Sequence, residues 1–264
     1  MSGLQTQNLT LNYGEQPIIH NLNLDIPLNK ITVLVGANGS GKSTLLRSLA
    51  RLLKPSSGQV LLDEKALHTI PTKEVAKRIS ILPQGPVAPE GVTVQQLVKQ
   101  GRYPYQRWYQ QWSVEDERLV EQSLAATGLL ELKDKPLDSL SGGQRQRAWI
   151  AMTLAQETPI ILLDEPTTFL DMTHQIELLD FMFELNRNEK RTIVMVLHDL
   201  NLACRYADNL VAVHNRTVVY QGAPESIVTT DMVKRIFGME AIIDRDPLFG
   251  TPLCIPKGKG RVIK

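Results

Sequence analysis

The sequence predicts an α/β fold with a doubly wound parallel sheet at its core, antiparallel strands near the N-terminus and an inserted helical segment. Continuous apolar runs rich in Val, Ile and Leu are typical of strands buried on both faces of a parallel sheet. They occur at Val33–Val35, Ile160–Leu163 and Ile193–Leu197. Each is followed by a polar turn and a helical pattern, at Lys42–Leu52, Asp171–Asn188 and Leu200–Tyr206 respectively. Residues 85–158 instead have the pattern of amphipathic helices.

Length and composition narrow the class of protein. With 264 residues the chain is long enough for a large core, and a formal net charge of +1 does not favour a nucleic-acid partner bound by a broad basic field. The two cysteines, Cys204 and Cys254, are too few and too far apart for a disulfide framework or a metal knuckle. The sequence shows no secretory signal, and no apolar run reaches the roughly 18 residues that a membrane span needs. We therefore expect any membrane-spanning part to belong to a partner protein.

The first predicted region, residues 1–84, joins antiparallel strands to the first part of the core. Leu4–Leu11 and Ile18–Ile26 alternate apolar with polar residues, which is typical of half-exposed strands. Tyr13 lies between them. Its ring is a candidate for stacking on adenine, although a tyrosine of the core or of a sheet edge is nearly as consistent with the local sequence.

A phosphate-binding loop is predicted between the first core strand and its helix. The sequence GANGSGKST matches the pattern G-x-x-x-x-G-K-[ST]. Its glycines allow successive backbone N–H groups to face a triphosphate, the lysine reaches the β and γ oxygens, and the serine hydroxyl ligates Mg²⁺. The core is therefore predicted to be a P-loop NTPase domain of the RecA-like type. The candidate ATP-binding residues are Gly36, Ala37, Asn38, Gly39, Ser40, Gly41, Lys42, Ser43 and Thr44.

The helical insertion is predicted at residues 85–158. Thr93–Gln96 and Ser113–Asp116 resemble capping boxes, and Gly128 is placed to end the second helix. Five aromatic residues lie close together in this region: Tyr103, Tyr105, Trp108, Tyr109 and Trp112. Two interpretations stay open, because such a group either forms an exposed patch that receives a helix of a membrane subunit or fills the core of the insertion.

Polar residues at two strand ends mark the second part of the core, residues 159–238. One apolar run stops at Asp164-Glu165, and the next is followed by His198. Because ligands bind at the carboxyl ends of strands in open α/β sheets, we expect these residues on the same rim as the phosphate loop. Asp164 is the candidate for holding Mg²⁺, Glu165 is the candidate general base, and His198 is a further catalytic candidate. Residues 239–264, with three prolines and a basic end, are expected to form a small irregular appendage.

A second potential anion site begins in the helical insertion. Ser141, Gly142, Gly143 and Gln144 stand at a predicted helix start, where free N–H groups and the positive end of the dipole converge. If this site cannot meet the phosphate loop within one chain, the simplest geometry is a head-to-tail homodimer. Ser141–Gly143 of each subunit then caps the γ-phosphate held by Lys42 of the other, and ATP joins the two subunits.

Together, these motifs resemble those of the ATP-binding subunits of ABC transporters, whose signature is LSGGQ, residues 140–144 here. In order along the chain, the matching positions are Tyr13, the phosphate loop, Gln84, the signature, Asp164-Glu165, Leu170-Asp171 and His198. The resemblance implies that Gln84 contacts Mg²⁺ and senses a transmembrane partner. It also implies that Glu165 is the catalytic carboxylate, that His198 contacts the γ-phosphate, and that Asp171 couples the two sites across the dimer.

Finer similarity points to one group of importers. Residues 101–112, 166–180 and 198–208 are similar to the subfamily that takes up ferric siderophores, together with its haem and vitamin B12 relatives. Residues 246–252, DPLFGTP, resemble the members that take up catecholate siderophores. The resemblance implies permease subunits as partners, an extracytoplasmic substrate-binding protein as an indirect partner, and a peripheral place on the cytoplasmic face of the inner membrane. The alternative, a soluble ABC-type ATPase, usually has two cassettes or a long coiled-coil insertion, and this sequence has neither.

Overall fold

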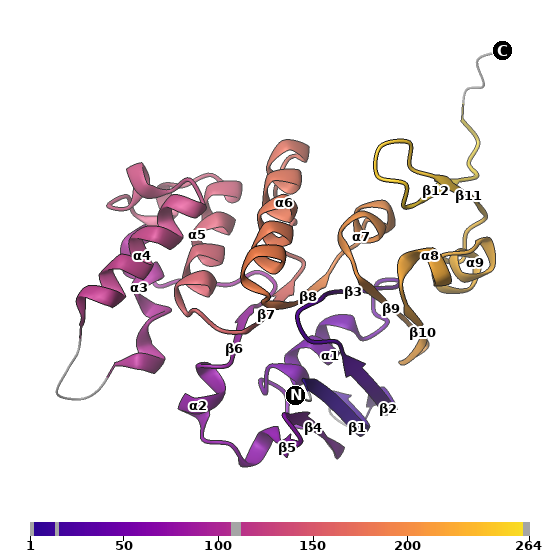
Figure 1. Ribbon diagram of the computed structural model, residues 1–264, viewed down its shortest axis with the longest axis horizontal. Helices are drawn as coiled ribbons and strands as arrows, with labels where there is room; N and C mark the ends of the chain where they lie inside the picture. The colour runs from indigo at the N-terminus through magenta and orange to yellow at the C-terminus, as the bar shows by residue number, and fades with distance from the viewer. Residues whose placement is uncertain (1–2, 14–15, 107–111, 261–264) are drawn as a thin grey trace.

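The core of the protein is a six-stranded sheet, seen in a computed structural model that describes residues 3–13, 16–106 and 112–260 (Figure 1). The strand order is β10-β9-β3-β8-β7-β6, and all neighbours are parallel except β10 and β9. The strands are β3 (Ile31–Val35), β6 (Ile79–Leu82), β7 (Ile160–Asp164), β8 (Thr192–Val196), β9 (Asn209–His214) and β10 (Thr217–Gly222). Every residue of β3, β7 and β8 is buried, so the three predicted core strands are confirmed.

Both faces of this sheet are covered, which explains the continuous apolar runs. Ile193 and Met195 of β8 pack in one apolar core, and Val194 and Val196 pack in a second core on the opposite face. The helices that contribute to these cores or connect the strands are α1 (Lys42–Leu49), α2 (Thr72–Ala76), α6 (Met172–Glu189), α7 (Leu200–Tyr206), α8 (Pro224–Ile227) and α9 (Thr230–Phe237), with a 3₁₀ turn η1 (Leu67–Thr69). Helix α1 ends three residues before the predicted Leu52, because Arg51 adopts a left-handed conformation with φ 62°.

A four-stranded sheet in the order β2-β1-β4-β5 packs against α1. Its strands are β1 (Leu4–Tyr13), β2 (Gln16–Ile26), β4 (Ser57–Leu62) and β5 (Lys65–Ala66), and all its neighbours are antiparallel. The predicted antiparallel strands near the N-terminus are confirmed. Leu9, Leu11 and Ile19 point into the core shared with α1, while the intervening side chains are more exposed.

The helical insertion forms a separate apolar core at one end of the molecule (Figure 1). Its elements are α3 (Val94–Gln100), α4 (Val114–Ala126), α5 (Gly142–Ala155) and the 3₁₀ turns η2 (Tyr103–Tyr105), η3 (Leu130–Leu132) and η4 (Leu137–Ser139). Both predicted capping boxes, at Thr93 and Ser113, are present, and Gly128 follows the end of α4 with φ 64°. The boundaries proposed between the regions, after residues 84, 158 and 238, stay a prediction.

The aromatic residues of the insertion divide between the two interpretations. Tyr103 is 75% exposed, whereas Trp112 packs against the helical core and its Nε1 donates to Glu117. Trp108 and Tyr109 lie outside the described residues. The described members therefore support a mixed arrangement, part surface and part core.

The C-terminal appendage is not irregular, so that expectation was wrong. Strands β11 (Ala241–Arg245) and β12 (Pro252–Pro256) form an antiparallel hairpin. Pro252 and Pro256 stand at the two ends of β12, where a missing N–H group interrupts no ladder within the strand. In the described part of the chain, no helix is both long enough and apolar enough to span a membrane.

Candidate active site

The phosphate loop connects β3 to α1, as predicted. Gly36 has φ 149°, and a Cβ there would lie 2.2 Å from the carbonyl oxygen of Val213 in β9. Gly41, at the N-cap of α1, has φ 106°, and a Cβ there would lie 2.9 Å from Ile19 of β2. Only glycine combines these φ angles with such close neighbours, so the turn depends on both residues.

Lys42 is 5% exposed, and its ammonium group donates to the carbonyl oxygens of Gly36 (2.9 Å) and Ala37 (3.0 Å). Burial lowers the pKa of Lys42, although the nearby carboxylates of Glu165 and Asp164 act in the opposite direction. Burial of the Lys42 ammonium charge is unfavourable, and an anion within reach of Nζ therefore stabilises the charged form.

Ser43 and Asp164 provide oxygen atoms that fit Mg²⁺. Ser43 Oγ donates to Asp164 Oδ1 (2.8 Å), while the buried Oδ2 of Asp164 has no hydrogen-bond partner among the described residues. Burial raises the pKa of Asp164, although the hydrogen bond from Ser43 opposes this shift. Mg²⁺ prefers oxygen ligands and usually combines one or two carboxylates with waters and substrate phosphates. Ser43 and Asp164 fit such a mixed site, and in the described part of the chain no three His, Cys, Asp or Glu side chains form a metal-binding group.

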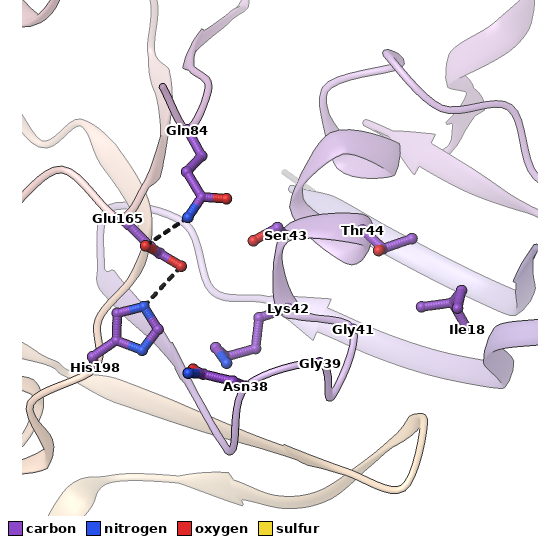
Figure 2. A pocket seen from close by; sticks show the side chains of 10 residues that line it. All are labelled: Ile18, Asn38, Gly39, Gly41, Lys42, Ser43, Thr44, Gln84, Glu165 and His198. Atoms are coloured by element: carbon purple, nitrogen blue, oxygen red, sulfur yellow. Dashed lines mark hydrogen bonds and ion pairs between the residues drawn. The ribbon is translucent and has the colours of Figure 1, made fainter. Parts of the chain in front are cut away.

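Glu165 is held between two side chains at the rim of the sheet. Gln84 Nε2 donates to Glu165 Oε2 (2.8 Å), and His198 Nε2 lies 2.7 Å from Glu165 Oε1 (Figure 2). Glu165 also has φ 53°, an uncommon conformation for a residue other than glycine. The carboxylate therefore has a defined position between β6, β7 and β8, and Figure 2 shows it across the cavity from Ser43.

Several of these residues line a cavity of about 460 Å³, although Asp164 is not part of its lining. Its lining includes nine of the candidate residues: Asn38, Gly39, Gly41, Lys42, Ser43, Thr44, Gln84, Glu165 and His198. Sequence reasoning did not single out Ile18, which also lines the cavity from β2. Nothing in its local sequence distinguishes it from other alternating strand residues, because only the packing of β2 beside Gly41 brings it there.

Ser141 is the N-cap of α5, and it forms a capping box with Gln144. Ser141 Oγ accepts from the N–H of Gln144 (3.2 Å), and Gln144 Oε1 accepts from the N–H of Ser141 (3.1 Å). Neither residue is part of the lining of the cavity around Lys42. The two predicted anion sites are therefore not brought together within the described part of one chain.

The loop after Glu165 does contact the start of α5. A Cβ atom added at Gly142 would lie 3.7 Å from Phe169 Cβ. One added at Gly143 would lie 3.3 Å from Leu170 Cδ2. The next residue, Asp171, caps α6 by accepting from the N–H of His174 (2.9 Å). Hydrogen bonds from the backbone and the side chain of His174 lower the pKa of Asp171.

The side chain of Tyr13 lies outside the described residues, so its stacking on adenine stays a prediction.

The fold and the rim geometry define a P-loop nucleoside triphosphatase. The sequence profile of the family described as "ABC transporter" matches residues 19–168. The "Probable siderophore transport system ATP-binding protein YusV" of Bacillus subtilis (strain 168) is 65% identical over 263 residues, covering 100% of this chain and 96% of the relative. The "Petrobactin import ATP-binding protein FpuD" of Bacillus anthracis is 64% identical over 261 residues, covering 99% and 96%. The dimeric structure of MJ0796, a bacterial ABC transporter cassette, matches with a TM-score of 0.75 and 28% identity, covering 83% of this chain and 98% of that chain.

Within the class of P-loop enzymes, this chain belongs to the ABC transporter family. It is an ATP-hydrolysing subunit of an importer, which confirms the predicted fold class, ATP ligand and enzymatic activity. ABC ATPase cassettes dimerise and work with membrane permease subunits.

Proposed function

We propose that two head-to-tail copies of this chain hydrolyse Mg-ATP between them and thereby drive the uptake of a ferric siderophore. The observation that carries the dimer is the separation of Ser141 from the cavity that contains Lys42. Gly142 and Gly143 are in the first turn of α5, where backbone N–H groups have no intrahelical acceptor. A γ-phosphate held by the partner copy supplies these donors with an acceptor.

The residues of the cavity divide the chemistry between them. Lys42 turns from the loop carbonyls to the phosphate oxygens, where its charge offsets the negative charge of the transition state. Glu165, in the position set by Gln84 and His198, orients the attacking water as a general base. His198, which lies at the Glu165 oxygen opposite the one bound by Gln84, contacts the γ-phosphate. When bound by Ser43, Asp164 and Gln84, Mg²⁺ supplies further neutralisation of the phosphate charge.

The cargo is proposed from the relatives. Two proteins that match nearly the whole chain are named for siderophore transport and for petrobactin import. The remaining assignments follow from that role: permease subunits as direct partners, an extracytoplasmic substrate-binding protein as an indirect one, and a place on the cytoplasmic face of the inner membrane. Haem or vitamin B12 import by the same machinery is the alternative.

The dimer is tested with Glu165→Gln, which keeps a side chain of the same shape but removes the general base. We expect the variant to elute as a dimer from a sizing column in saturating Mg-ATP and to hydrolyse ATP at least about 100-fold more slowly than wild type. Glu225→Gln, at an exposed position on α8, is the matched control and keeps wild-type behaviour. A Glu165→Gln variant that stays monomeric in saturating Mg-ATP contradicts the proposed dimer.

The cargo is tested by radioactive uptake in iron-starved cells that lack this chain and any redundant system. The panel contains several ferric siderophores, haem and vitamin B12, and the cells carry either wild type or Glu165→Gln. Restoration of ferric siderophore uptake by wild type alone supports the proposal. Restoration confined to haem or vitamin B12 refutes the siderophore assignment but leaves the ATPase activity in place.

A further inference from the structure

The hairpin β11–β12 lies against α7, the helix that follows His198 (Figure 1). Asp199 caps α7 by accepting from the N–H groups of Asn201 (2.8 Å) and Leu202 (3.0 Å), so the N-cap of the helix directly follows the histidine. On the other side of His198, the N–H of Leu197 donates to the carbonyl oxygen of Leu34 in β3 (3.3 Å). The backbone of His198 is therefore held by the sheet before it and by α7 after it.

Asn201 joins the first turn of α7 to β12. Its Oδ1 accepts from the N–H of Cys254 (2.7 Å), and its Nδ2 donates to the carbonyl oxygen of Cys254 (3.2 Å). Cys254 is in register with Ile243 of β11, and Asn201 bonds the backbone groups that face away from that strand. One side chain thus satisfies both polar groups of an edge-strand residue, three positions after His198.

Arg205 makes a second connection, one turn further along the same face of α7. Its Nη2 lies 2.9 Å from Asp246 Oδ2, and its guanidinium lies 4.1 Å from the centre of the Phe249 ring. Asp246 also accepts from the N–H groups of Leu248 (2.9 Å) and Phe249 (3.1 Å). The hydrogen bond from Arg205, followed by these two backbone bonds, lowers the pKa of Asp246. The loop between β11 and β12 is thereby shaped to receive Arg205.

Apolar packing completes the contact. Ala203 and Cys204 of α7 are buried in the same core as Ala241 of β11 and Cys254 of β12. The hairpin therefore covers the outer side of α7, while the inner side of the helix faces β3. Helix α7 has only seven residues and gains its order from these neighbours rather than from its own length.

We propose that the hairpin β11–β12 is a positioning element for His198, acting through Asn201 and Arg205. It sets the direction of α7, and α7 sets the place of the imidazole 2.7 Å from Glu165. The inference rests on the proposed role of His198 in hydrolysis. Asn201 and Arg205 are positioning residues, because they act through the helix and line no part of the cavity.

The test is a double-mutant cycle between Asn201→Ala and His198→Ala in the full chain. Single-turnover hydrolysis of radiolabelled ATP, with enzyme in excess, keeps slow variants measurable. We expect Asn201→Ala to lower the maximal single-turnover rate about tenfold, within the hundredfold that a misplacement of about 1 Å causes. The enzyme concentration that gives half of this maximal rate should change by less than about twofold. In the His198→Ala background, Asn201→Ala has no further effect. Asn188→Ala, at an exposed position on α6, is the matched control.

Asp246→Asn provides a second variant in case Asn201→Ala does not fold. The asparagine keeps an acceptor for the N–H groups of Leu248 and Phe249 but removes the charge that pairs with Arg205. We expect a smaller loss of rate that again disappears in the His198→Ala background. Equal losses with and without His198, or wild-type rates in both variants, refute the positioning role. Wild-type hydrolysis by His198→Ala alone refutes the proposed role of His198 itself.

Discussion

The ion pair between Arg102 and Asp116 organises the helical region that carries the signature. The two residues are 4% and 7% exposed, and Arg102 Nε donates to Asp116 Oδ1 (2.8 Å). Arg102 Nη1 also donates to the carbonyl oxygen of Ala155, the last residue of α5 (2.8 Å). The other oxygen of Asp116 accepts from the N–H and the hydroxyl of Ser113 in the capping box of α4. A single guanidinium thus connects the end of α3 to one end of each of the other two helices.

Asp116→Asn removes the charge that compensates Arg102 while keeping an acceptor for the capping box. Breaking a buried pair by removing one partner costs about 3–5 kcal/mol, because it leaves an uncompensated buried charge. Arg102 keeps its bond to Ala155, and Glu157 lies 3.9 Å away, so we expect the lower end of this range, about 3 kcal/mol. That is a large share of the roughly 5–15 kcal/mol by which a domain is stable.

Urea unfolding followed by circular dichroism measures this cost at pH 7. Burial acts to raise the pKa of Asp116, but the hydrogen bonds from Arg102 and Ser113 outweigh it, and the pKa lies below its usual range. The contribution of Asp116 is therefore present above its unfolded pKa of about 3.9 and is lost as the pH falls through the lower folded value. The difference between wild type and Asp116→Asn should accordingly narrow below about pH 4.

The control for this prediction is the double variant Arg102→Met/Asp116→Asn. Methionine has no charge to leave unpaired, so we expect the double variant to be more stable than Asp116→Asn alone. Two results refute the reasoning: a cost below about 1 kcal/mol for Asp116→Asn, the size of an ordinary exposed pair, or a double variant less stable than the single one.

Three further predictions concern the ATP site. Lys42→Ala should abolish ATP binding in isothermal titration while the circular dichroism spectrum stays that of wild type; retained affinity contradicts the role of the lysine. ATP at 100 times its dissociation constant should stabilise the wild type by about 2.7 kcal/mol in total. Asp164→Asn should lose the part of this stabilisation that depends on Mg²⁺, which is measured by thermal unfolding with and without EDTA. Ser141→Ala should lower the free energy of unfolding by about 1 kcal/mol through loss of the α5 cap, and an unchanged urea midpoint contradicts that cap.

The parts of the fold that were predictable are those with a local signature. The runs that became β3, β7 and β8 are apolar without interruption because both faces of the sheet are covered. The capping boxes at Thr93 and Ser113 were visible because their hydrogen bonds join residues three positions apart. The hairpin β11–β12 was missed because proline-rich composition suggested irregular structure, whereas the partners that order it, Asn201 and Arg205, are about forty to fifty residues away.

The rim of the site was predictable for a different reason. Asp164 is the last residue of β7, Glu165 follows it and His198 comes shortly after β8, and parallel strands bring their carboxyl ends to one edge. Their mutual geometry was not predictable. That Gln84 and His198 approach the two oxygens of one carboxylate depends on the order β8-β7-β6, and short-range sequence patterns contain no information about strand order.

The loop between Glu165 and Asp171 runs from the cavity around Lys42 to the start of α5, the two predicted anion sites that do not meet within one chain. Its turns are closed by local bonds, since the N–H of Thr168 donates to the carbonyl oxygen of Glu165 and that of Leu170 donates to Thr167 (both 3.2 Å). At one end, Glu165 faces the cavity of its own chain; at the other, Leu170 packs beneath Gly143 of α5, which the proposed dimer presents to the partner's γ-phosphate. A Cβ at Gly143 would press on Leu170 Cδ2 at 3.3 Å, whereas a Cβ at Gly142 would meet Phe169 at an ordinary contact distance of 3.7 Å. In the proposed dimer, Gly143 therefore serves both the open amides at the start of α5 and the close contact with the loop that follows Glu165.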